Sequence, residues 1–366
     1  MLIARKVNYN MKLKVLIIGP NSSMKGGITT VISGYKSNGY YNDNFEVKHY
    51  SSCIDGPFIF KLLYTIIKLF FFPFFIIFYR PKIAHIHAAY GTSFLRKSFY
   101  IKLCKFFSIK VVIHNHGAEW ENFYEKKSLS QKEKIKSTYN LCEYIIVLSE
   151  EWKERYIQFL DDTKVIVINN FTSIAPADVK KESHLKTNIL FIGEFCERKG
   201  TYNIPEIISL MKNKGNVAVN IVGYGDTKRL RDSITKFDLD KCISIIGFAD
   251  YTKKIHLLAN SDIFLFPSYN EGVPMVLLEA MTFGIPCVTT DVGGIKSIIN
   301  YNFDNGILFN PDDLLLMAKE IDKLIDDKDY YDRISSNCKV VANNFSIDNH
   351  MLQVVKLYNK LVKEEV

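Results

Sequence analysis

The sequence predicts an α/β protein with two domains, and three observations support this. The chain has 366 residues, 48% of them apolar, which is long for one hydrophobic core and ample for two. Short apolar runs suited to buried parallel strands alternate with segments of helical character. The segment 172–187 lacks periodicity and contains Pro176, so we expect a linker there, between an N-terminal domain over 11–171 and a C-terminal domain over 188–345.

The N-terminal half is expected to form parallel βα units. The sequence predicts strands at 14–19, 82–87, 110–117, 144–149 and 165–168, with helices at 28–35, 94–107 and 150–159. Ser149 can cap the last of these helices. Because the carboxyl ends of parallel strands share one edge of the sheet, the residues that follow the strands should line one crevice. These residues are His87, Gly91, His114, His116 and Gly117.

The C-terminal half repeats the alternation. Strands are expected at 188–193, 217–222, 244–248 and 263–266, and a further strand with a glycine turn at 286–294. Helices are expected at 255–259, 275–283, 314–326 and 330–343, and a hairpin-like piece at 305–309. The segment 351–363 has apolar residues at helical spacing and should form a final helix.

The stretch 267–280 carries the strongest functional signal. It predicts a strand, a turn over 269–272 and a helix, with Pro274 at the first helical position. The free N–H groups and the dipole of that helix form an anion site at its N-terminus. Glu271 lies on the turn, and Glu279 lies about two helical turns further on. Carboxylates beside an anion site suit a ligand that offers both diphosphate and hydroxyl groups, such as a nucleotide sugar.

In context, this stretch resembles a known family signature. The two glutamates, with seven residues between them, in the context E-G-x-P-x-x-x-L-E-A, are similar to the signature of retaining GT-B glycosyltransferases, in particular glycosyltransferase family four. The resemblance implies two Rossmann-like domains facing across a cleft, with a C-terminal helix at 346–366 crossing back to the N-terminal domain. An ordinary strand–turn–helix with two surface glutamates is the alternative.

Other segments resemble further motifs of the family. Gly193 to Gly200 resembles G-R-x-x-x-x-K-G, in which Lys199 would neutralise the donor diphosphate. The family arginine is Glu194 here, and Arg198 is the candidate replacement. The turn at Gly223 resembles V-G-x-G, and Phe248 would either stack on the nucleotide base or belong to the core.

Two N-terminal segments also resemble parts of the family. The Gly26-Gly27 pair follows the first strand, where the family has a glycine loop. The segment H-x-H-G-A-E resembles the loop whose histidine reaches the donor sugar or the acceptor, which favours His116, with His114 and Glu119 as second choices. A structural role for these histidines or a metal site are the alternatives.

The resemblance therefore implies a set of site residues. The catalytic candidates are Glu271, His116 and Lys199. The donor-binding candidates are Gly26, Gly27, Gly193, Arg198, Lys199, Gly223, Phe248, Ser268, Glu271, Gly272, Val273, Met275, Val276 and Glu279. No metal or other cofactor is expected, since Asp238-Leu239-Asp240 matches D-x-D only on a predicted surface loop.

Charge and hydropathy point to a membrane surface. Residues 1–180 hold 25 Lys and Arg against 14 Asp and Glu, whereas the remainder has a formal charge of −3. The sequence shows no nucleic-acid motif, so a membrane or a pyrophosphate-bearing acceptor is preferred over nucleic acid as the anionic partner, and a merely solvated basic face is the alternative. The segment 57–79 is strongly apolar but contains Lys61, Lys68 and Pro73, which favours an interfacial helix over a buried or a transmembrane one.

The remaining features suggest the compartment. The seven cysteines include no C-x-x-C pair and suit a reduced, cytoplasmic protein. The first ten residues are too polar for a secretory signal, and Met11 directly precedes the first strand, so either Met1 or Met11 is the start. We expect a location on the cytoplasmic face of the inner membrane, as a peripheral protein.

The predicted function is sugar transfer with retention at the anomeric carbon. The donor would be a nucleotide sugar, with a UDP-sugar favoured, and the acceptor a lipid-linked saccharide in bacterial surface polysaccharide biosynthesis. A GT-B nucleotide-sugar 2-epimerase and a noncatalytic nucleotide-sugar-binding protein are the alternatives. A dinucleotide oxidoreductase is disfavoured because Gly19-Pro20-Asn21 does not supply G-x-G-x-x-G after the first strand.

Overall fold

The chain divides into two compact units. The computed structural model describes residues 12–38, 45–172, 174, 182–300 and 304–363, so the possible N-terminal extension and part of the expected linker lie outside the described residues. The first unit contains the chain up to Val147, Lys153–Ile168 and the residues from Met351 onward. The second unit contains Leu148–Trp152 and Asn169–His350.

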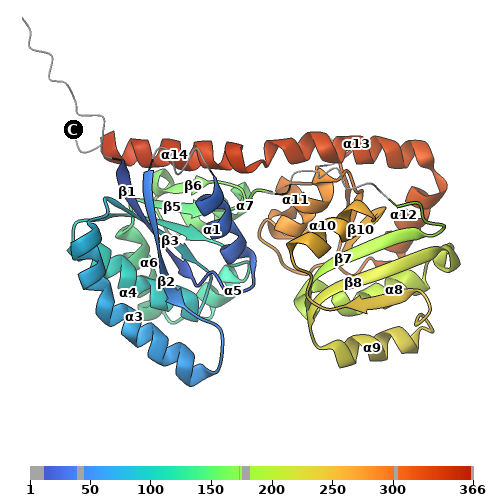
Figure 1. Cartoon of the computed structure of the whole chain (residues 1–366), viewed down its shortest axis with the longest axis horizontal. Helices are drawn as coiled ribbons and strands as arrows, with labels where there is room; N and C mark the ends of the chain where they lie inside the picture. Colours follow the sequence, from blue (N-terminus) through green and yellow to red (C-terminus); the bar gives the residue numbers. More distant parts are fainter. Residues whose placement is uncertain (1–11, 39–44, 173, 175–181, 301–303, 364–366) are drawn as a thin grey trace, which may run out of the picture. The chain divides into compact units, whose positions relative to one another are not determined.

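The first unit is built on a parallel six-stranded sheet (Figure 1). Its order is β2-β1-β3-β4-β5-β6, so the direction of strand addition reverses between β1 and β3. The bounds are β1 Leu13–Pro20, β2 Phe45–Cys53, β3 Ile83–Ala88, β4 Lys110–Asn115, β5 Tyr144–Val147 and β6 Val165–Val167. Strand β2 was not predicted, because an edge strand is only partly buried and its sequence, FEVKHYSSC, is correspondingly polar.

Helices cover both faces of this sheet, as parallel βα units require. They are α1 Gly27–Ser37, α3 Phe58–Tyr79, α4 Thr92–Phe106, α5 Trp120–Glu125, α6 Leu129–Asn140 and α7 Glu150–Ile157. The expected cap of α7 is confirmed, since the backbone N–H of Trp152 donates to the Ser149 hydroxyl at 3.3 Å. The last helix, α14 Ile347–Lys363, returns to the first unit, where Lys110 Nζ donates to the Leu361 carbonyl at 2.6 Å.

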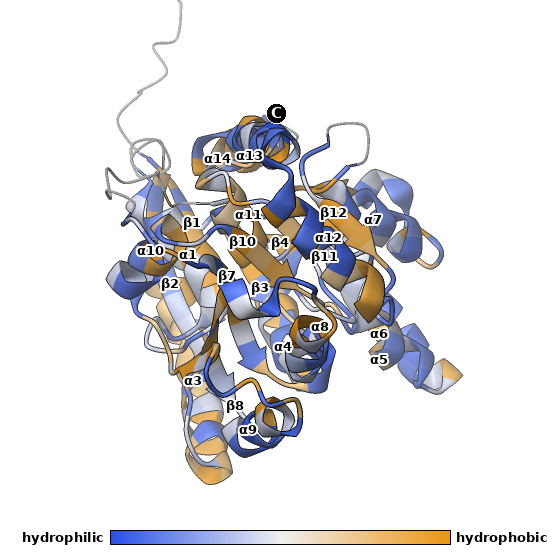
Figure 2. Ribbon diagram, turned by 90° about the vertical axis from the view of Figure 1, so that its right-hand side faces the viewer, coloured by the Kyte–Doolittle hydropathy of each residue, from blue (hydrophilic) through white to orange (hydrophobic). Residues whose placement is uncertain are grey.

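Helix α3 differs from the other helices of the unit because most of its apolar side chains face outward. It runs through Pro73 without a break over 22 residues, and by length and composition it could cross a membrane. Its fully buried side chains are Phe72, Ile76 and Tyr79. The buried alternative is therefore wrong, since a core helix would be covered on most of its surface. Figure 2 shows α3 as an almost continuously apolar ribbon.

The second unit has its own parallel sheet, in the order β12-β11-β10-β7-β8-β9. The bounds are β7 Thr187–Phe195, β8 Val217–Gly225, β9 Ile243–Ile246, β10 Ile263–Phe266, β11 Cys287–Thr290 and β12 Ile307–Phe309. The expected hairpin at 305–309 is wrong, because β12 pairs in parallel with β11. The chain crosses the sheet between β9 and β10, so the strand order reverses at the β7–β10 pair. Ligands of open α/β sheets bind at such a reversal, outside the carboxyl ends of the strands.

The helices of the second unit are α8 Ile204–Ser209, α9 Thr227–Lys236, α10 Tyr251–Ala259, α11 Met275–Thr282, α12 Leu314–Asp326 and α13 Lys328–Asn344. They include the four that were predicted, α10 to α13, and two that were not, α8 and α9. Helix α11 starts at Met275 as expected, but Pro274 is extended, with φ −71° and ψ 117°, and lies at the N-cap rather than at the first helical position. Gly284 follows α11 with φ +70°, a left-handed conformation that suits glycine at the end of a helix.

Candidate functional site

Two loops meet where the strand order of the second unit reverses. One loop follows β7 and carries Arg198 and Lys199, and the other follows β10. The Arg198 carbonyl accepts from the backbone N–H of Tyr269 at 2.8 Å and from the Ser268 hydroxyl at 2.9 Å. Gly200 makes this approach feasible: its φ is +63°, and a Cβ there would lie 1.8 Å from the Pro267 carbonyl oxygen. The turn therefore requires glycine at position 200.

Glu271 lies at the centre of this junction. Its side chain is buried, and Oε1 accepts from Lys199 Nζ at 2.6 Å and from the Ser268 hydroxyl at 2.7 Å. Arg198 Nη1 lies 3.4 Å from the same oxygen and donates to the Asn270 carbonyl at 3.0 Å. Two cations therefore share one carboxylate, which leaves a net positive charge available to an anion. The structure brings together the residues that the sequence predicted, Glu271, Lys199, Ser268 and Arg198.

A glycine pair supports the turn that carries Glu271. The backbone N–H of Gly294 donates to the Glu271 carbonyl at 3.3 Å. A Cβ at Gly293, where φ is +53°, would lie 1.9 Å from that carbonyl oxygen, and a Cβ at Gly294 would lie 2.4 Å from the Gly272 carbonyl oxygen. These two glycines thus allow close packing behind the turn that carries Glu271.

Glu279 lies on α11 in a more apolar environment. Its Oε1 accepts from Lys254 Nζ on α10 at 2.6 Å, and burial raises the pKa of its carboxyl group. Its other oxygen, Oε2, is buried and has no hydrogen-bond partner among the described residues. An unsatisfied buried carboxylate oxygen is unfavourable, and a ligand hydroxyl would satisfy it. Sequence reasoning missed Lys254 because its only signal is a basic residue near the start of a short helix.

The start of α11 provides backbone donors. Val273 and Met275 are buried and Val276 is half-buried, while the Val273 carbonyl accepts from the Asn170 amide at 2.8 Å. Gly272 packs tightly, since a Cβ there would lie 3.2 Å from the side chains of Leu148 and Trp152. The first N–H groups of a helix have no intrahelical acceptor, so this end of α11 is suited to an anion.

The remaining donor candidates of this unit occupy neighbouring strand ends. Gly193 in β7 and Gly223 in β8 lie side by side, and a Cβ on Gly223 would be 1.7 Å from the Gly193 carbonyl oxygen. Phe248 follows β9 and is 49% exposed, so the core alternative for this ring is wrong. Glu194 is exposed and contributes its backbone carbonyl to Thr201 at 2.9 Å. Arg198, the candidate replacement for the family arginine, lies beside Glu271.

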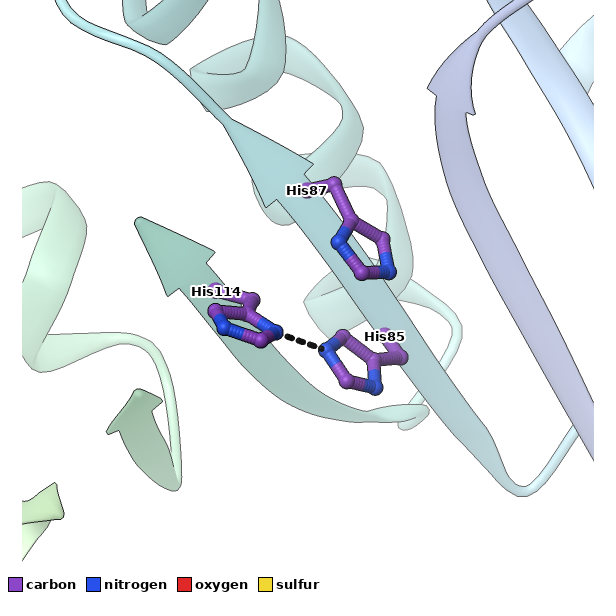
Figure 3. Close-up of side chains that lie close together, drawn as sticks. All are labelled: His85, His87 and His114. Atoms are coloured by element: carbon purple, nitrogen blue, oxygen red, sulfur yellow. Dashed lines mark hydrogen bonds between the residues drawn. The ribbon is translucent and has the colours of Figure 1, made fainter. Parts of the chain in front are cut away.

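Four histidines of the first unit, His85, His87, His114 and His116, form a ladder on β3 and at the end of β4. Figure 3 shows the three buried ones, His85, His87 and His114. His85 Nε2 lies 3.3 Å from His114 Nδ1, and His87 Nδ1 lies 2.9 Å from His116 Nε2. His114 points into the core and is fully buried, so its expected place at the crevice edge is wrong. His116 follows β4 and is half-buried, and Glu119 is half-buried at the start of α5, so both remain candidates for contact with a substrate.

Three of these histidines lie close enough for a metal ion to be considered. Nitrogens of His85, His87 and His114 lie within 4.8 Å of one another. The hydrogen bonds between the rings already use Nε2 of His85 and Nδ1 of His114, and the rings of His85 and His87 stack at 4.5 Å with an interplanar angle of 6°. Burial lowers the pKa of His87 well below its ordinary value, so this ring is neutral. The geometry fits a structural ladder better than a metal centre.

The comparisons with known proteins support the predicted family. Residues 177–341, most of the second unit, match the model of the family glycosyl transferases group 1. A 127-residue segment is 33% identical to the amylovoran biosynthesis glycosyltransferase AmsK of Erwinia amylovora, covering 32% of this chain and 31% of that protein. The matched segments span 31% to 61% of the first four curated relatives.

A longer match and the solved structures extend over both units. The chain is 26% identical over 282 residues to the Escherichia coli UDP-Gal:alpha-D-GlcNAc-diphosphoundecaprenol alpha-1,3-galactosyltransferase, covering 69% of this chain and 70% of that one. Sucrose-phosphate synthase from Thermosynechococcus elongatus superposes with a TM-score of 0.80 at 16% identity, covering 96% and 100% of the two chains. Anabaena HepE in complex with UDP-glucose superposes with a TM-score of 0.75 at 18% identity, covering 95% of this chain and 100% of that one. The predicted GT-B fold is confirmed.

Proposed function

We propose that the protein is a retaining glycosyltransferase that moves a sugar from a nucleotide sugar, with a UDP-sugar favoured, to a lipid-linked saccharide in bacterial surface polysaccharide biosynthesis. One observation carries the proposal: Glu271 lies at the strand-order reversal of the second unit and shares its carboxylate between Lys199 and Arg198. A carboxylate and two cations at one point suit a donor that has hydroxyls beside a diphosphate.

The site can perform this transfer with its own residues. The bond between the anomeric carbon and the diphosphate oxygen breaks through an oxocarbenium-like transition state. An acceptor hydroxyl adds to the carbon on the face from which the diphosphate leaves, and its proton passes to the departing diphosphate oxygen. Negative charge grows on the departing diphosphate. Lys199, Arg198 and the N–H groups of Met275 and Val276 stabilise that charge, and losing one such donor typically costs about 3 kcal/mol. These cations take the role that a metal ion has in other transferases, so the reaction is proposed to need none.

Two carboxylates then orient the donor. Glu271 accepts hydrogen bonds from sugar hydroxyls and keeps Lys199 and Arg198 beside the leaving group. Glu279 accepts a ribose hydroxyl through its buried, unsatisfied Oε2. Phe248, half-exposed after β9, offers an aromatic face to the base. His116 is proposed to reach the donor sugar or the acceptor.

The names of the relatives support the class of donor and acceptor. The E. coli relative is named for transfer from UDP-Gal to a saccharide on diphosphoundecaprenol, and other relatives for capsule and colanic acid biosynthesis. Anabaena HepE was solved with UDP-glucose bound. These names describe those proteins, and they favour a UDP-sugar and a lipid-linked acceptor here.

A lipid acceptor requires contact with a membrane, and α3 offers a surface for it. The exposed apolar side chains of the helix are Phe58, Ile59, Phe60, Leu62, Leu63, Ile66, Ile67, Phe70, Phe71, Phe74, Ile77 and Phe78. Lys61 and Lys68 lie among them, and the Lys68 ammonium lies 5.1 Å from the centre of the Tyr50 ring. Such a helix binds anionic bilayers by burying its apolar face and keeping lysines at the headgroups. We propose a peripheral location on the cytoplasmic face.

The test is turnover of UDP- and GDP-sugars with and without bacterial membrane extract. We expect extract-dependent release of UDP, which Glu271→Gln and Lys199→Ala abolish while Lys212→Ala, on the exposed surface of the same unit, retains it. Conversion of the sugar nucleotide without an acceptor would instead indicate an epimerase. Binding without release under every condition would indicate a noncatalytic binding protein.

A further inference from the structure

The first unit contains a pocket of about 290 Å³ that the donor site does not explain. It lies at the carboxyl ends of β1, β2 and β3, where the strand order of this sheet reverses. The α1 and α4 helices both begin at the pocket: Gly26 and Gly27 line it at the start of α1, and Ser93 lines it in the first turn of α4. Both helices exceed ten residues, so their N-termini add positive potential.

The charged side chains of the pocket wall are all cationic. Lys25, Arg96 and Lys97 line the pocket, and its described lining includes no aspartate or glutamate. Arg96 follows Ser93 by one helical turn, and its Nε is buried with no hydrogen-bond partner among the described residues. The buried Nε of Arg96 and the buried ammonium of Lys97 lie on the same helix at this pocket, which is unfavourable unless an anion joins them.

Lys97 is the most unusual of the three. It is 1% exposed, and its ammonium donates to the Ser52 hydroxyl, which donates in turn to the Gly19 carbonyl at 2.8 Å. Burial lowers the pKa of Lys97 to about 7. A neutral hydroxyl does not compensate a buried positive charge, and a bound anion would do so.

His87 adds a buried group that the ladder leaves unused. It is fully buried and lines the pocket, and its Nδ1 is occupied by His116. Its Nε2 is buried without a hydrogen-bond partner in the described part of the chain. In the tautomer with a proton on Nε2, this ring can donate to an anion in the pocket while accepting from His116.

We propose that this pocket binds the phosphate or diphosphate group of the acceptor lipid. The inference rests on the proposed function for the identity of the lipid, while the anion site rests on the pocket alone. Gly26 and Gly27, predicted for the donor, would then contact the acceptor phosphate through their backbone.

Helix α4 favours an acceptor lipid over the donor as the source of the phosphate. It carries Arg96 and Lys97 toward the pocket, and Leu95 and Phe99, each at least half-exposed, toward the outside. Helix α3, with its exposed apolar surface, packs against α4 in the same unit. One helix therefore joins an anion pocket to an apolar surface, which suits an amphiphile with a phosphate head and an apolar tail.

The test measures binding to the full chain by calorimetry, with UDP saturating so that the donor site is filled. Inorganic pyrophosphate and farnesyl diphosphate are the probes. We expect both to bind, farnesyl diphosphate more tightly, and Arg96→Gln and Lys97→Met to weaken both at least tenfold. Phe99→Ser should weaken farnesyl diphosphate alone. Lys134→Gln, an exposed lysine on α6, is the matched control and should change neither.

Three outcomes would overturn the inference. One is that neither probe binds the UDP-saturated protein. Another is that binding is unchanged in Arg96→Gln, which does not depend on whether the buried Lys97→Met variant folds. The third is that both variants weaken UDP itself, which would assign the pocket to the donor diphosphate. None of these binding measurements requires turnover. A lack of transferase activity would therefore contradict the proposed function but would leave the assignment of the anion site unchanged.

Discussion

The Lys254–Glu279 pair allows a quantitative test of the donor site. Glu279 is 2% exposed, and Lys254 is its partner at 2.6 Å. Lys254→Met leaves the carboxylate buried with no cation, and breaking a buried pair in this way typically costs about 3–5 kcal/mol. For a unit of this size, each kcal/mol lowers Tm by roughly 2–4 °C, so we expect a decrease of roughly 10 °C.

The pH dependence of the stability loss in Lys254→Met follows from the direction in which the pKa of Glu279 is shifted. The folded protein already raises the pKa of Glu279 above the unfolded value, and loss of Lys254 raises it further. Unfolding then releases a proton at pH values between the two pKa values, so the penalty in Lys254→Met grows as pH rises through that range. We expect a smaller decrease in Tm at pH 5 than at pH 7.5, because at pH 5 the carboxyl group is closer to its protonated form.

A double-mutant cycle provides the control. Lys254→Met combined with Glu279→Gln removes both charges, so it should be more stable than Lys254→Met alone when thermal unfolding is followed at pH 7.5. Both single variants should also weaken UDP binding, because Glu279 would be displaced or neutralised. A double variant no more stable than Lys254→Met, or a single variant with unchanged Tm, would refute the assignment of a buried, interacting pair.

Three further predictions concern other parts of the chain. Gly200→Ala should lower kcat/KM at least tenfold, because the new Cβ would lie 1.8 Å from the Pro267 carbonyl oxygen. The control Gly215→Ala has open space around its Cβ and should leave kcat/KM unchanged. Equal activity of the two variants would contradict the tight turn at Gly200. Phe70→Glu with Phe74→Glu should abolish flotation with anionic liposomes without lowering Tm, since both side chains are exposed, and continued flotation would exclude α3 as the membrane contact. Burial lowers the pKa of His350 from 6.5 to about 4, so this group contributes about 3 kcal/mol to the free energy of unfolding above pH 6.5, and the contribution is lost as pH falls toward 4. In denaturant titrations, the free energy of unfolding of His350→Gln should therefore decline less steeply with falling pH than that of the unmodified protein. Identical slopes would contradict this.

Much of the second unit was predictable from the sequence because its local signals agree with its tertiary structure. Residues 263–283 form the expected strand, turn and helix, and Lys199, Ser268 and Arg198 meet at Glu271 as a motif-based prediction requires. Parallel strands at a reversal bring together loops that are seventy residues apart in the chain, so the motifs predict that these four residues lie close together.

Other features depend on contacts that the sequence does not reveal. Lys254 gains its role only because α10 packs beside α11. Strand β2 is polar because it lies at an edge, and β12 resembles a hairpin until the parallel pairing with β11 is known. His114 alternates with His116 in sequence, yet their positions relative to the end of β4 bury one and leave the other half-exposed.

The most direct test of the proposed chemistry is the stereochemistry of transfer. A UDP-sugar labelled with ¹³C at the anomeric carbon would be incubated with the protein and membrane extract, and the product examined by NMR. We predict acceptor-dependent transfer with the donor's anomeric configuration retained, and loss of transfer in Glu271→Gln. Inversion at the anomeric carbon, or full transfer by Glu271→Gln, would contradict a retaining reaction centred on Glu271.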